Sequence, residues 1–572
     1  MGIKIWRSLC DTLENSVHEL ATKCSLPRPI AILLAARNIE PKNVDSFFES
    51  SLKNLSDPYR FPGIVKAAER LWTAVQKREL ILIHGDYDTD GVTATALLAH
   101  VLRENGAEVA SFLPHRFDDG YGFTPDSLAK SLDTVGKNCK ALVTVDCGIN
   151  SVDAVEAANK RGIDVIITDH HEPSDEIPKA LAIINSKLYP ELKDLELLSG
   201  AGAAFKLAHA FIKFGRENNY GGFTTRLEDI LDFVALGTVA DIVPLLGENR
   251  ILVKNGMKIL RKQLRPGIRA LIETSRIKTK LKPSDITFKM APRINAAGRL
   301  GNANTALDLL NSTNIVEAYK YAEMLDKYNV QRQEKEQEIY EEARKQIEEK
   351  IDVVNSFSIL VAGEDWHQGV IGIVASRLAR DYNRPAIVLT IQKDGMAHGS
   401  GRSIGNLNLV DVLAQSSPLL ERYGGHPMAV GLGVARENIE LLSLEIDKNI
   451  RKHLSKEDLV DHINFDGEVE LYELDSEFFR FLDELSPFGH SNSRPVFKLS
   501  QLECVKTMAV GGKHSRGVLK DRRNYEIEFI AFNRSVDSLP RATWDIIATP
   551  QINEYYGERR PQLQIVDLQP AF

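Results

Sequence analysis

The segment HGDYDTDG places three acids and a histidine in one short stretch, directly after the apolar run LILI. They are His84, Asp86, Asp88 and Asp90. Carboxylates this close repel one another, so the arrangement is costly unless a cation lies between them. A calcium-binding EF-hand loop needs a glycine at its sixth position and a glutamate at its twelfth; Gly91 fits the first, but Leu97 occupies the second. The segment therefore predicts a site for another divalent cation, with a surface Asp-rich turn as the alternative.

Acid or imidazole side chains follow apolar segments at three further places. Asp146 lies in VTVDCGI, Asp241 lies in GTVADIVPL, and TDHHEP carries Asp169, His170 and His171. A single buried acid or histidine is usually a satisfied core residue, but four such segments together indicate a metal site. Mixed carboxylate and imidazole ligands suit Mn²⁺ or Mg²⁺, and five or six ligands are enough for two ions.

These polar segments stand at the ends of predicted strands. Short Val-, Ile- and Leu-rich runs alternate with helical segments, with the strands expected around residues 79–86, 107–113, 141–146, 164–169 and 181–186. This alternation is typical of a parallel sheet covered by helices on both faces. Ligands of such sheets collect at the carboxyl ends of the strands, which is where the acids and histidines lie.

The rest of the chain divides by its sequence texture. We expect an N-terminal helical segment (1–60), an α/β domain with the metal site (61–312), a long connecting helix (313–350), a smaller α/β domain (351–455) and a β-rich C-terminal domain (456–572). The connecting segment is densely charged, lacks glycine and proline, and shows no sustained heptad, which favours a solvent-flanked helix over a coiled coil. Five or so short strands after residue 456 predict a small closed barrel similar to an OB fold.

Composition excludes several protein classes. The 572 residues are 26% charged and 43% hydrophobic, which fits a globular protein of several domains and not a disordered one. No apolar run approaches the roughly 20 residues that span a bilayer, and the N-terminus lacks a signal-peptide core. The five cysteines are scattered and form no C-x-x-C pair, so neither a disulfide framework nor a cysteine zinc site is expected. We expect a cytoplasmic protein without a membrane partner.

The net charge of −8 hides two basic blocks. Residues 250–282 contain eleven Lys or Arg and one acid, and residues 506–523 contain six and one. A single charged run is usually a solvated face. Two such blocks on an acidic chain favour the hypothesis of a groove for a polyanion.

Glycine-rich motifs in the second half supply candidate phosphate-binding groups. GSGRS offers Ser400 and Arg402, and GGH offers the Gly425 backbone and His426, each expected in a glycine turn. Phosphate oxygens bind arginine forks and backbone N–H groups in such turns.

Three further arginines are candidates for the same ligand. Arg293 and Arg299 in PRINAAGR are expected to project from one loop, and Arg116 in PHRFDDGYG follows the second strand. An ordinary surface salt bridge is the alternative for each of them. Trp366 and Tyr121 are aromatic residues that could stack on bases, with a core role as the alternative for Trp366.

Together these motifs resemble a known family. DYDTDG, TVDCGI, TDHHEP and GTVADIVPL are similar, in order, to the four motifs of the DHH phosphoesterase superfamily. PRINAAGRLGNA, DWHQGVIGIVASRL, GSGRS and GGHPMAVGL resemble its DHHA1 half, and the C-terminal domain with SPFGHSNSRPVF resembles the OB domain of the RecJ exonucleases. SNSRP stands where RecJ sequences usually have a glycine-asparagine-proline turn.

The resemblance implies a two-metal 5′→3′ exonuclease on single-stranded DNA, dependent on Mn²⁺ or Mg²⁺ and acting in DNA repair and recombination. It also implies a single-strand-binding protein and a helicase as partners. By resemblance, one ion is held by His84, Asp88 and Asp146, and the other by Asp90, Asp146, His170 and Asp241. Asp86 and Asp169 then orient their neighbours, and His171 contacts the scissile phosphate or protonates the leaving oxygen, so that His171, Asp146 and Asp169 form the catalytic set.

Three functions remain open from the sequence. The first is this exonuclease, with a 5′-phosphate sensed by Arg116, Ser400 and Arg402. The second is a DHH phosphodiesterase for short oligonucleotides or cyclic dinucleotides; the β-rich C-terminal domain and the basic blocks count against it. The third is a scaffold of the same fold without activity, which the full set of ligand residues disfavours.

Overall fold

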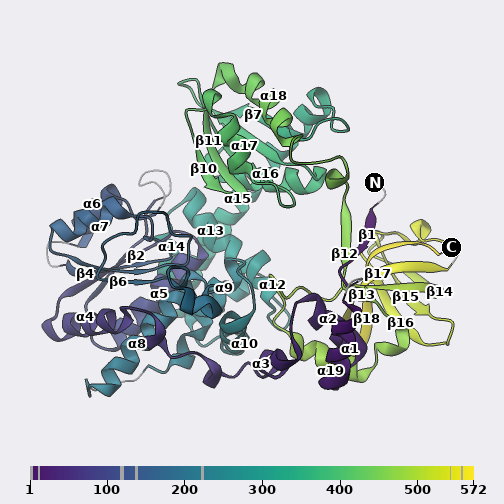
Figure 1. Ribbon diagram of the computed structural model, residues 1–572, viewed down its shortest axis with the longest axis horizontal. Coiled ribbons are helices and arrows are strands. Elements are labelled where there is room, and N and C mark those ends of the chain that lie inside the picture. The colour runs from purple at the N-terminus through teal and green to yellow at the C-terminus, as the bar shows by residue number, and fades with distance from the viewer. Residues whose placement is uncertain are drawn as a thin grey trace. The chain divides into compact units, whose positions relative to one another are not determined.

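The computed structural model describes residues 4–10, 13–115, 122–135, 139–220, 225–541, 543–555 and 558–571. Its contacts divide the chain into two compact units. The larger unit contains Trp6–Asn295, Ala303–Ala322 and the chain from Asn464 onward; the smaller contains Ala296–Asn302 and Glu323–Ile463, with the residues up to Ile5. Figure 1 follows the chain through both units.

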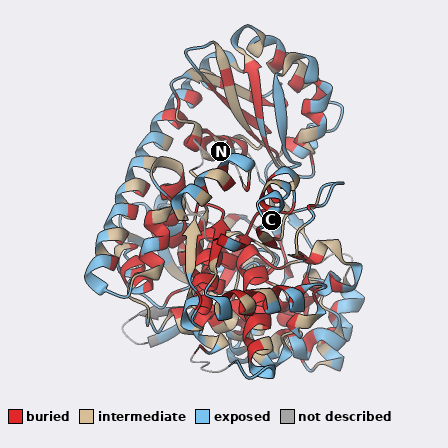
Figure 2. Ribbon diagram, turned by 90° about the vertical axis from the view of Figure 1, so that its left-hand side faces the viewer, coloured by how far each residue is buried: buried red, intermediate tan, exposed pale blue. Residues whose placement is uncertain are grey.

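The larger unit is built on the parallel sheet that the sequence predicts. Its strand order is β3-β2-β4-β5-β6, and every neighbouring pair is parallel. The strands are β2 (Leu80–Gly85), β3 (Val109–Phe112), β4 (Cys139–Val145), β5 (Asp164–Thr168) and β6 (Ala182–Ile184). Apolar side chains fill β2, β4 and β5 almost without interruption because helices cover both faces. Figure 2 shows the buried residues, in red, in the interior of the structure.

Helices flank this sheet in two groups. In Figure 1 α6 and α7 lie on one side of it, and α4 and α8 lie on the other. The covering helices are α4 (Ile64–Lys77), α5 (Thr89–Glu104), α6 (Pro125–Val135), α7 (Val152–Lys160) and α8 (Gly200–Glu217). Further helices continue the unit: α9 (Leu231–Ala240), α10 (Gly247–Leu260), α11 (Pro266–Thr274), α12 (Pro283–Asp285), a π-helical turn (Ile286–Met290), α13 (Ala291–Leu300, which ends in the smaller unit) and α14 (Asn304–Asn311).

The C-terminal strands form the expected closed OB-like barrel. The sheet order is β13-β14-β15-β16-β18-β17, and β14 also pairs with β17, which closes a ring of five strands. The strands are β13 (Gly467–Glu468), β14 (Phe497–Val510), β15 (His514–Lys520), β16 (Glu526–Ala531), β17 (Trp544–Tyr555) and β18 (Glu558–Pro570), with α19 (Ser476–Leu485) before β14. Two further short strands, β1 (Ile5–Ser8) and β12 (His462–Phe465), belong neither to the barrel nor to the sheet of the smaller unit.

The N-terminal helices pack on this barrel. They are α1 (Glu14–Lys23), α2 (Arg28–Ala36) and α3 (Val44–Glu49), and their apolar residues join those of α19 and the barrel in one hydrophobic core. The loop SNSRP is part of the same junction. Buried Asn492 donates through Nδ2 to the carbonyls of Leu485 (2.9 Å) and Pro487 (2.8 Å) and accepts from Arg37 Nε (2.9 Å).

Arg250, on α10, connects the larger unit's α/β region to the N-terminal helix α3 and to α19. It is buried, and its guanidinium donates to the carbonyls of Phe47, Leu485 and Glu484 at 2.8–2.9 Å. Burial and the charge of Arg37 lower its pKa to about 10. Although Arg250 opens the first basic block in the sequence, it is a structural residue and not part of a basic surface.

The smaller unit carries a mixed sheet of order β10-β11-β9-β8-β7. Only β7 and β8 are parallel; the other pairs are antiparallel. Its elements are most of α15 (Ile315–Lys350), then β7 (Ile359–Glu364), α16 (Gln368–Tyr382), β8 (Ala386–Ile391), β9 (Met396–Arg402), α17 (Leu409–Gln415), β10 (Arg422–His426), β11 (Ala429–Ala435) and α18 (Ile439–Ile450).

Strands β9 and β10 correct the expectation of glycine turns. GSGRS lies in β9 and GGH in β10, so Ser400, Arg402, Gly425 and His426 belong to strands. The glycines serve close packing: a Cβ on Gly399 would lie 2.3 Å from Leu389 Cδ2, and one on Gly401 would lie 2.7 Å from Val430 Cγ2. Within the described ranges, no helix is long and apolar enough to cross a membrane.

Candidate metal centre and nucleic-acid interface

The Asp-rich loop connects β2 to the N-terminus of α5. Asp88 caps that helix, and its Oδ1 accepts from the backbone N–H groups of Asp90 (2.9 Å) and Gly91 (3.1 Å). Asp86 Oδ1 accepts from Tyr87 N at 2.8 Å. A Cβ on Gly91 would lie 2.5 Å from the Asp86 carbonyl oxygen, so only glycine allows this tight a turn. The helix N-terminus stabilises negative charge at the place where the loop gathers it.

Asp90, in the first turn of α5, contacts the N-terminus of a second helix, α8. It is buried, and its two carboxylate oxygens accept from the N–H groups of Gly200 (2.6 Å) and Ala201 (3.0 Å) at the N-terminus of α8. Burial and the neighbouring charge of Asp88 nevertheless raise its pKa to about 7. The acid loop is thus fixed by backbone groups from two helices while its carboxylates still repel one another.

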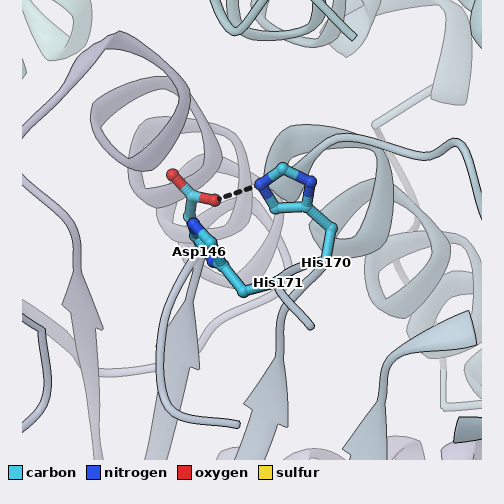
Figure 3. Close-up of side chains that lie close together, drawn as sticks. All are labelled: Asp146, His170 and His171. Atoms are coloured by element: carbon cyan, nitrogen blue, oxygen red, sulfur yellow. Dashed lines mark ion pairs between the residues drawn. The ribbon is translucent and has the colours of Figure 1, made fainter. Parts of the chain in front are cut away.

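Asp146 and the histidine pair meet at the ends of β4 and β5 (Figure 3). His170 Nε2 lies 3.1 Å from Asp146 Oδ1, and the same nitrogen lies 3.6 Å from Asp241 Oδ2. Asp146 has a φ of 60°, in the left-handed region that non-glycine residues rarely adopt. A Cβ on Gly200 would lie 2.4 Å from Asp146 Oδ1, so this glycine makes room for the carboxylate against α8.

Asp169 organises the segment that carries the two histidines. Its Oδ1 accepts from the backbone N–H groups of His170 (2.7 Å) and His171 (3.1 Å) and lies 2.7 Å from His171 Nδ1, while its Oδ2 accepts from Ile149 N at 3.0 Å. Although burial opposes the charged imidazole, the hydrogen bond and charge of Asp169 raise the pKa of His171 to about 9. His171 is therefore held as a potential proton donor, and Asp169 sets its orientation.

Asp241 brings a fourth element to the cluster. It is the C-cap residue of α9, and burial together with the charges of Asp90 and Asp88 raises its pKa to about 9. Burial, followed by the charge of His171, lowers the pKa of His170 to about 3, so His170 is neutral at physiological pH. A neutral imidazole is the form that binds a metal.

Potential ligand atoms gather in three overlapping groups, in each of which they lie within 4.8 Å of one another. The groups are Asp86, Asp88 and Asp146; Asp90, His170 and Asp241; and Asp146, His170 and His171. Asp146 Oδ1 accepts no hydrogen bond from any described residue, although His170 Nε2 lies beside it. Buried acids with raised pKa values, an Asp146 oxygen without a hydrogen bond and a neutral imidazole fit hard divalent cations such as Mn²⁺ or Mg²⁺.

The sequence prediction differs from this geometry at two positions. His84 is in none of the three groups of described residues; its Nε2 lies 3.2 Å from Ser127 Oγ, and its ring packs between Phe112 and Phe123. Asp86, expected only to orient its neighbours, is in a group with Asp88 and Asp146. His84 lies within β2, whereas Asp86 follows the last residue of the strand and belongs to the loop before α5.

Helix α13 contributes residues that the sequence prediction placed in a loop or missed. Asn295 Oδ1 accepts from both Thr89 N (2.8 Å) and Thr89 Oγ1 (2.7 Å), which ties this helix to the acid loop. Arg293 lies on the same helix and donates through Nη1 to the Lys289 carbonyl at 2.7 Å. No local pattern distinguishes Asn295 from an ordinary helical asparagine; its position inside PRINAAGR is the one available signal.

The other substrate candidates lie in the smaller unit. Arg402 Nη1 donates to Ser400 Oγ and to the Gly401 carbonyl, both at 2.8 Å. A Cβ on Gly372, in α16, would lie 3.0 Å from Ser400 Oγ and 3.1 Å from Arg402 Nη2, so this helix runs close to both. Arg299, on α13, donates through Nη1 to the Gly369 carbonyl in the first turn of α16 at 2.9 Å.

His426 lies on the same face of this sheet as Arg402. His426 pairs with Ala429, and Ala429 pairs with Arg402, so the three residues form a row across β10, β11 and β9. Directly paired residues point to the same face, which leaves the methyl of Ala429 between the two larger side chains. Gly425, next to His426, has a φ of 137°, and a Cβ there would lie 2.4 Å from the Ala429 carbonyl oxygen. Ser400, Arg402 and His426 therefore lie on one face of this sheet, with β11 between His426 and the other two.

Three predicted residues have other outcomes. Arg116 and Tyr121 lie outside the described residues. Trp366 is buried among apolar residues of the smaller unit, and its Nε1 donates to Glu342 Oε2 at 2.8 Å. Trp366 therefore has the core role.

A basic groove of about 680 Å³ lies in the larger unit, between the α10–α12 region and the barrel. Its cationic lining residues are Lys254, Lys258, Arg261, Lys280, Lys282, Arg494 and Arg559. Asp483 is the one acid among the groove residues the structure describes, and it pairs with Arg559 at 2.7 Å. The first basic block thus lines a concave surface and is more than a solvated face.

Comparison with known proteins accounts for nearly the whole chain. Three family models match it: the DHH family N-terminal domain over residues 80–238, the DHHA1 domain over 355–452 and the RecJ OB domain over 465–567. The single-stranded-DNA-specific exonuclease RecJ of Dickeya dadantii is 36% identical over 567 residues, 96% of either chain. This chain belongs to the RecJ family.

Other RecJ proteins agree in sequence and in structure. The Escherichia coli RecJ is 35% identical over 574 residues, covering 95% of this chain and 96% of the relative. The crystal structure of Thermus thermophilus RecJ in complex with Mn²⁺ matches with a TM-score of 0.82 at 28% identity, covering 99% of this chain and 80% of that chain. Its Mg²⁺ complex matches with a TM-score of 0.76 at 26% identity, covering 99% and 79%. The fold of this chain is the RecJ fold.

Proposed function

We propose that this protein is a metal-dependent exonuclease that degrades single-stranded DNA from the 5′ end, in DNA repair and recombination. The observation that carries the proposal is the convergence of seven acid and imidazole residues from four segments into overlapping ligand groups at the carboxyl edge of the DHH sheet. The RecJ relatives are named as single-stranded-DNA-specific exonucleases, and their solved structures hold Mn²⁺ or Mg²⁺.

Two divalent ions fit the residues available. We assign Asp86, Asp88 and Asp146 to one ion and Asp90, Asp146, His170 and Asp241 to the other, so that Asp146 bridges them. Asp86 replaces His84 in this assignment because its carboxylate lies with the other ligand atoms, whereas His84 Nε2 lies beside Ser127. When bound, such ions polarise the phosphate oxygens and lower the pKa of a water molecule.

His171 is our candidate for the catalytic proton donor. Its ring is partly exposed beside the ligand cluster, and Asp169 holds Nδ1 at 2.7 Å, which leaves Nε2 for the substrate. An imidazolium at this place donates a hydrogen bond to the scissile phosphate or a proton to the leaving oxygen. Asp169 acts through His171 as a positioning residue.

We further propose that Ser400, Arg402 and His426 of the smaller unit bind the 5′-terminal phosphate. Arg116, Arg293, Arg299 and the Gly425 backbone are each candidates for a contact to a phosphate of the DNA. A terminal monophosphate carries more negative charge than an internal diester, and an arginine beside a hydroxyl distinguishes the two. The Arg402–Ser400 hydrogen bond, at 2.8 Å, supports this proposal because it holds the guanidinium and the hydroxyl next to each other.

The basic groove is our candidate for the path of the strand beyond the cleavage site. Its cations come from both the DHH domain and the barrel, as expected for a surface that binds consecutive phosphates. We also propose the division into residues 1–60, 61–312 (DHH), 313–350, 351–455 (DHHA1) and 456–572 (OB). A cytoplasmic location, which rests on the composition and the scattered cysteines, is part of the same proposal. A single-strand-binding protein and a helicase as partners are also part of it and rest on the family resemblance.

The decisive assay compares substrates with purified protein in Mn²⁺. We expect rapid degradation of a long 5′-phosphorylated single strand, slower degradation of its 5′-hydroxyl form, and little activity on blunt duplex. Arg402→Ala should reduce the preference for the 5′-phosphate by about 10- to 150-fold, because a charge-assisted hydrogen bond contributes about 1.5–3 kcal/mol. Arg436→Ala, at an arginine paired with Glu364 in the same unit, is the matched control.

Two results would contradict the proposal. Faster turnover of a dinucleotide than of the long strand would favour a phosphodiesterase for short substrates. Attack on a strand whose 5′ end is blocked, or full 5′-phosphate discrimination by Arg402→Ala, would refute the end-recognition assignment.

A further inference from the structure

An exposed aromatic side chain lies in the turn just before α13 in the larger unit. Phe288 is 77% exposed, whereas Ile286 and Met290, two residues to either side, are fully buried. The backbone that presents the ring is therefore anchored in the core, and the ring points away from it. All three residues belong to the π-helical turn before α13. Such turns are rare and are frequent at functional sites.

The turn is joined to the segment that carries Asp241. Thr287 Oγ1 lies 3.5 Å from the Val239 carbonyl oxygen near the end of α9, and Asp241 follows two residues later. On its other side, the turn leads into α13, whose Asn295 holds the acid loop through Thr89. Phe288 is thus fixed between two elements that position proposed metal ligands.

A second exposed apolar side chain follows Asp241, on the segment to which Thr287 is hydrogen-bonded. Ile242, directly after Asp241, is 57% exposed and has a φ of 60°. For a β-branched residue this left-handed conformation is a genuine outlier, and such strain persists only where the surroundings impose it. The strain here turns an isoleucine toward solvent beside a proposed metal ligand, which core packing does not explain.

Cations flank the aromatic ring along the chain. Lys289 pairs with Asp285 at 2.8 Å, and Arg293 lies one turn further on. Surfaces that bind single-stranded nucleic acid combine cations for the phosphates with aromatic faces for the bases. The local arrangement of Phe288, Lys289 and Arg293 has both components.

We propose that Phe288, supported by Ile242, is a stacking platform for a base of the single strand next to the scissile phosphate. This inference rests on the proposed exonuclease function and adds a positioning residue to it. A base held on Phe288 fixes the adjoining phosphate relative to the metal ligands of α9 and the acid loop. Stacking is tolerant of sequence because every base has a π-face, as a nuclease without sequence preference requires.

The test uses the full chain and 5′-phosphorylated strands with 2-aminopurine at successive positions from the 5′ end. In a chelator, binding of the wild type should quench the fluorescence at one or two of these positions. Phe288→Ala should abolish that quenching and weaken binding by about 5- to 150-fold, which corresponds to loss of one stacked base. Phe288→Trp should restore both, and Phe288→Leu should not. Leu444→Ala, at an exposed leucine of α18, is the control for loss of apolar surface.

An abasic nucleotide gives the second arm. When it replaces the quenched base, wild type and Phe288→Ala should bind and cleave equally, because no ring remains to stack. The inference would be overturned if Phe288→Ala lost as much binding on the abasic strand as on the normal one, or if its quenching were unchanged. It would also be overturned if the variant lost thermal stability with binding intact, because the ring would then pack against another part of the chain. If the wild type itself degrades no single strand in Mn²⁺, the proposed function fails, and not the platform alone.

Discussion

Asp241→Asn should stabilise the metal-free protein while abolishing its response to metal. The Asp241 side chain is 24% exposed, and burial and the charges of Asp90 and Asp88 raise its pKa from 3.8 to about 9. In the folded state its neutral form is therefore favoured. Folding gains nothing from this group's ionisation, and asparagine removes the charge without changing the shape.

The size of the effect follows from linkage. For an acid whose pKa is raised on folding, full stability is present below the unfolded pKa of 3.8 and is lost as pH rises toward the folded pKa of about 9. Each pH unit in that window costs about 1.4 kcal/mol. At pH 7 the cost reaches about 4 kcal/mol, and at pH 5 it is about 2 kcal/mol; solvent at the exposed part of the side chain reduces both.

Denaturant unfolding in a chelator between pH 5 and 8 measures this difference. The variant should be more stable than the wild type, and its advantage should grow with pH. In Mn²⁺ the order should reverse, because the wild type gains binding free energy that the variant lacks. Asp537→Asn, at an exposed acid of the barrel domain, is the control and should show neither effect. An advantage that is absent at pH 7, or that does not change with pH, would refute the account of the cluster as mutually repelling carboxylates.

Three further predictions concern the metal bridge, the junction and the groove. Asp146→Ala should lose both ions and cleavage while the fold survives; calorimetry that finds unchanged Mn²⁺ stoichiometry would refute the bridging role. Arg250→Met leaves three buried carbonyls without their donor and should lower the free energy of unfolding by more than about 3 kcal/mol, with an unchanged denaturation midpoint as the contrary result. Lys258→Gln with Lys282→Gln should flatten the salt dependence of single-strand binding by about 0.7 log units per lost phosphate contact, whereas a solvated face would leave the slope unchanged.

The sequence predicts the DHH sheet well because its signal is local. Strands buried on both faces must be continuously apolar, and polar residues at their ends are conspicuous against that background. This pattern predicts the acid loop, Asp146 and His170 as site residues, and in the structure they lie together. The sequence does not distinguish His84 from Asp86 in this respect, because the difference depends on the residue at which β2 ends and the acid loop begins.

The glycine-rich strands show the opposite case. Glycine disfavours strands, so GSGRS and GGH suggest turns when each is considered alone. In the structure Leu389 and Val430 occupy the space that a larger side chain at Gly399 or Gly401 of β9 would need. Contacts between residues far apart in the chain decide such positions. The same holds for Asn295 and Phe288, whose roles depend on neighbours in other elements.

The shared core of the N-terminal helices and the barrel has a consequence for how the protein is made. The apolar faces of α1 and α2 emerge from the ribosome before the barrel, whose residues that cover them follow about 460 residues later. At 5–20 residues per second the wait is about 20–90 s, during which these helices are without their partner and open to chaperones or to aggregation. A nonsense mutation anywhere before the barrel therefore does more than remove a nucleic-acid-binding domain. It leaves the beginning of the chain permanently uncovered, and such products should be degraded in the cell and not accumulate as partly active enzymes.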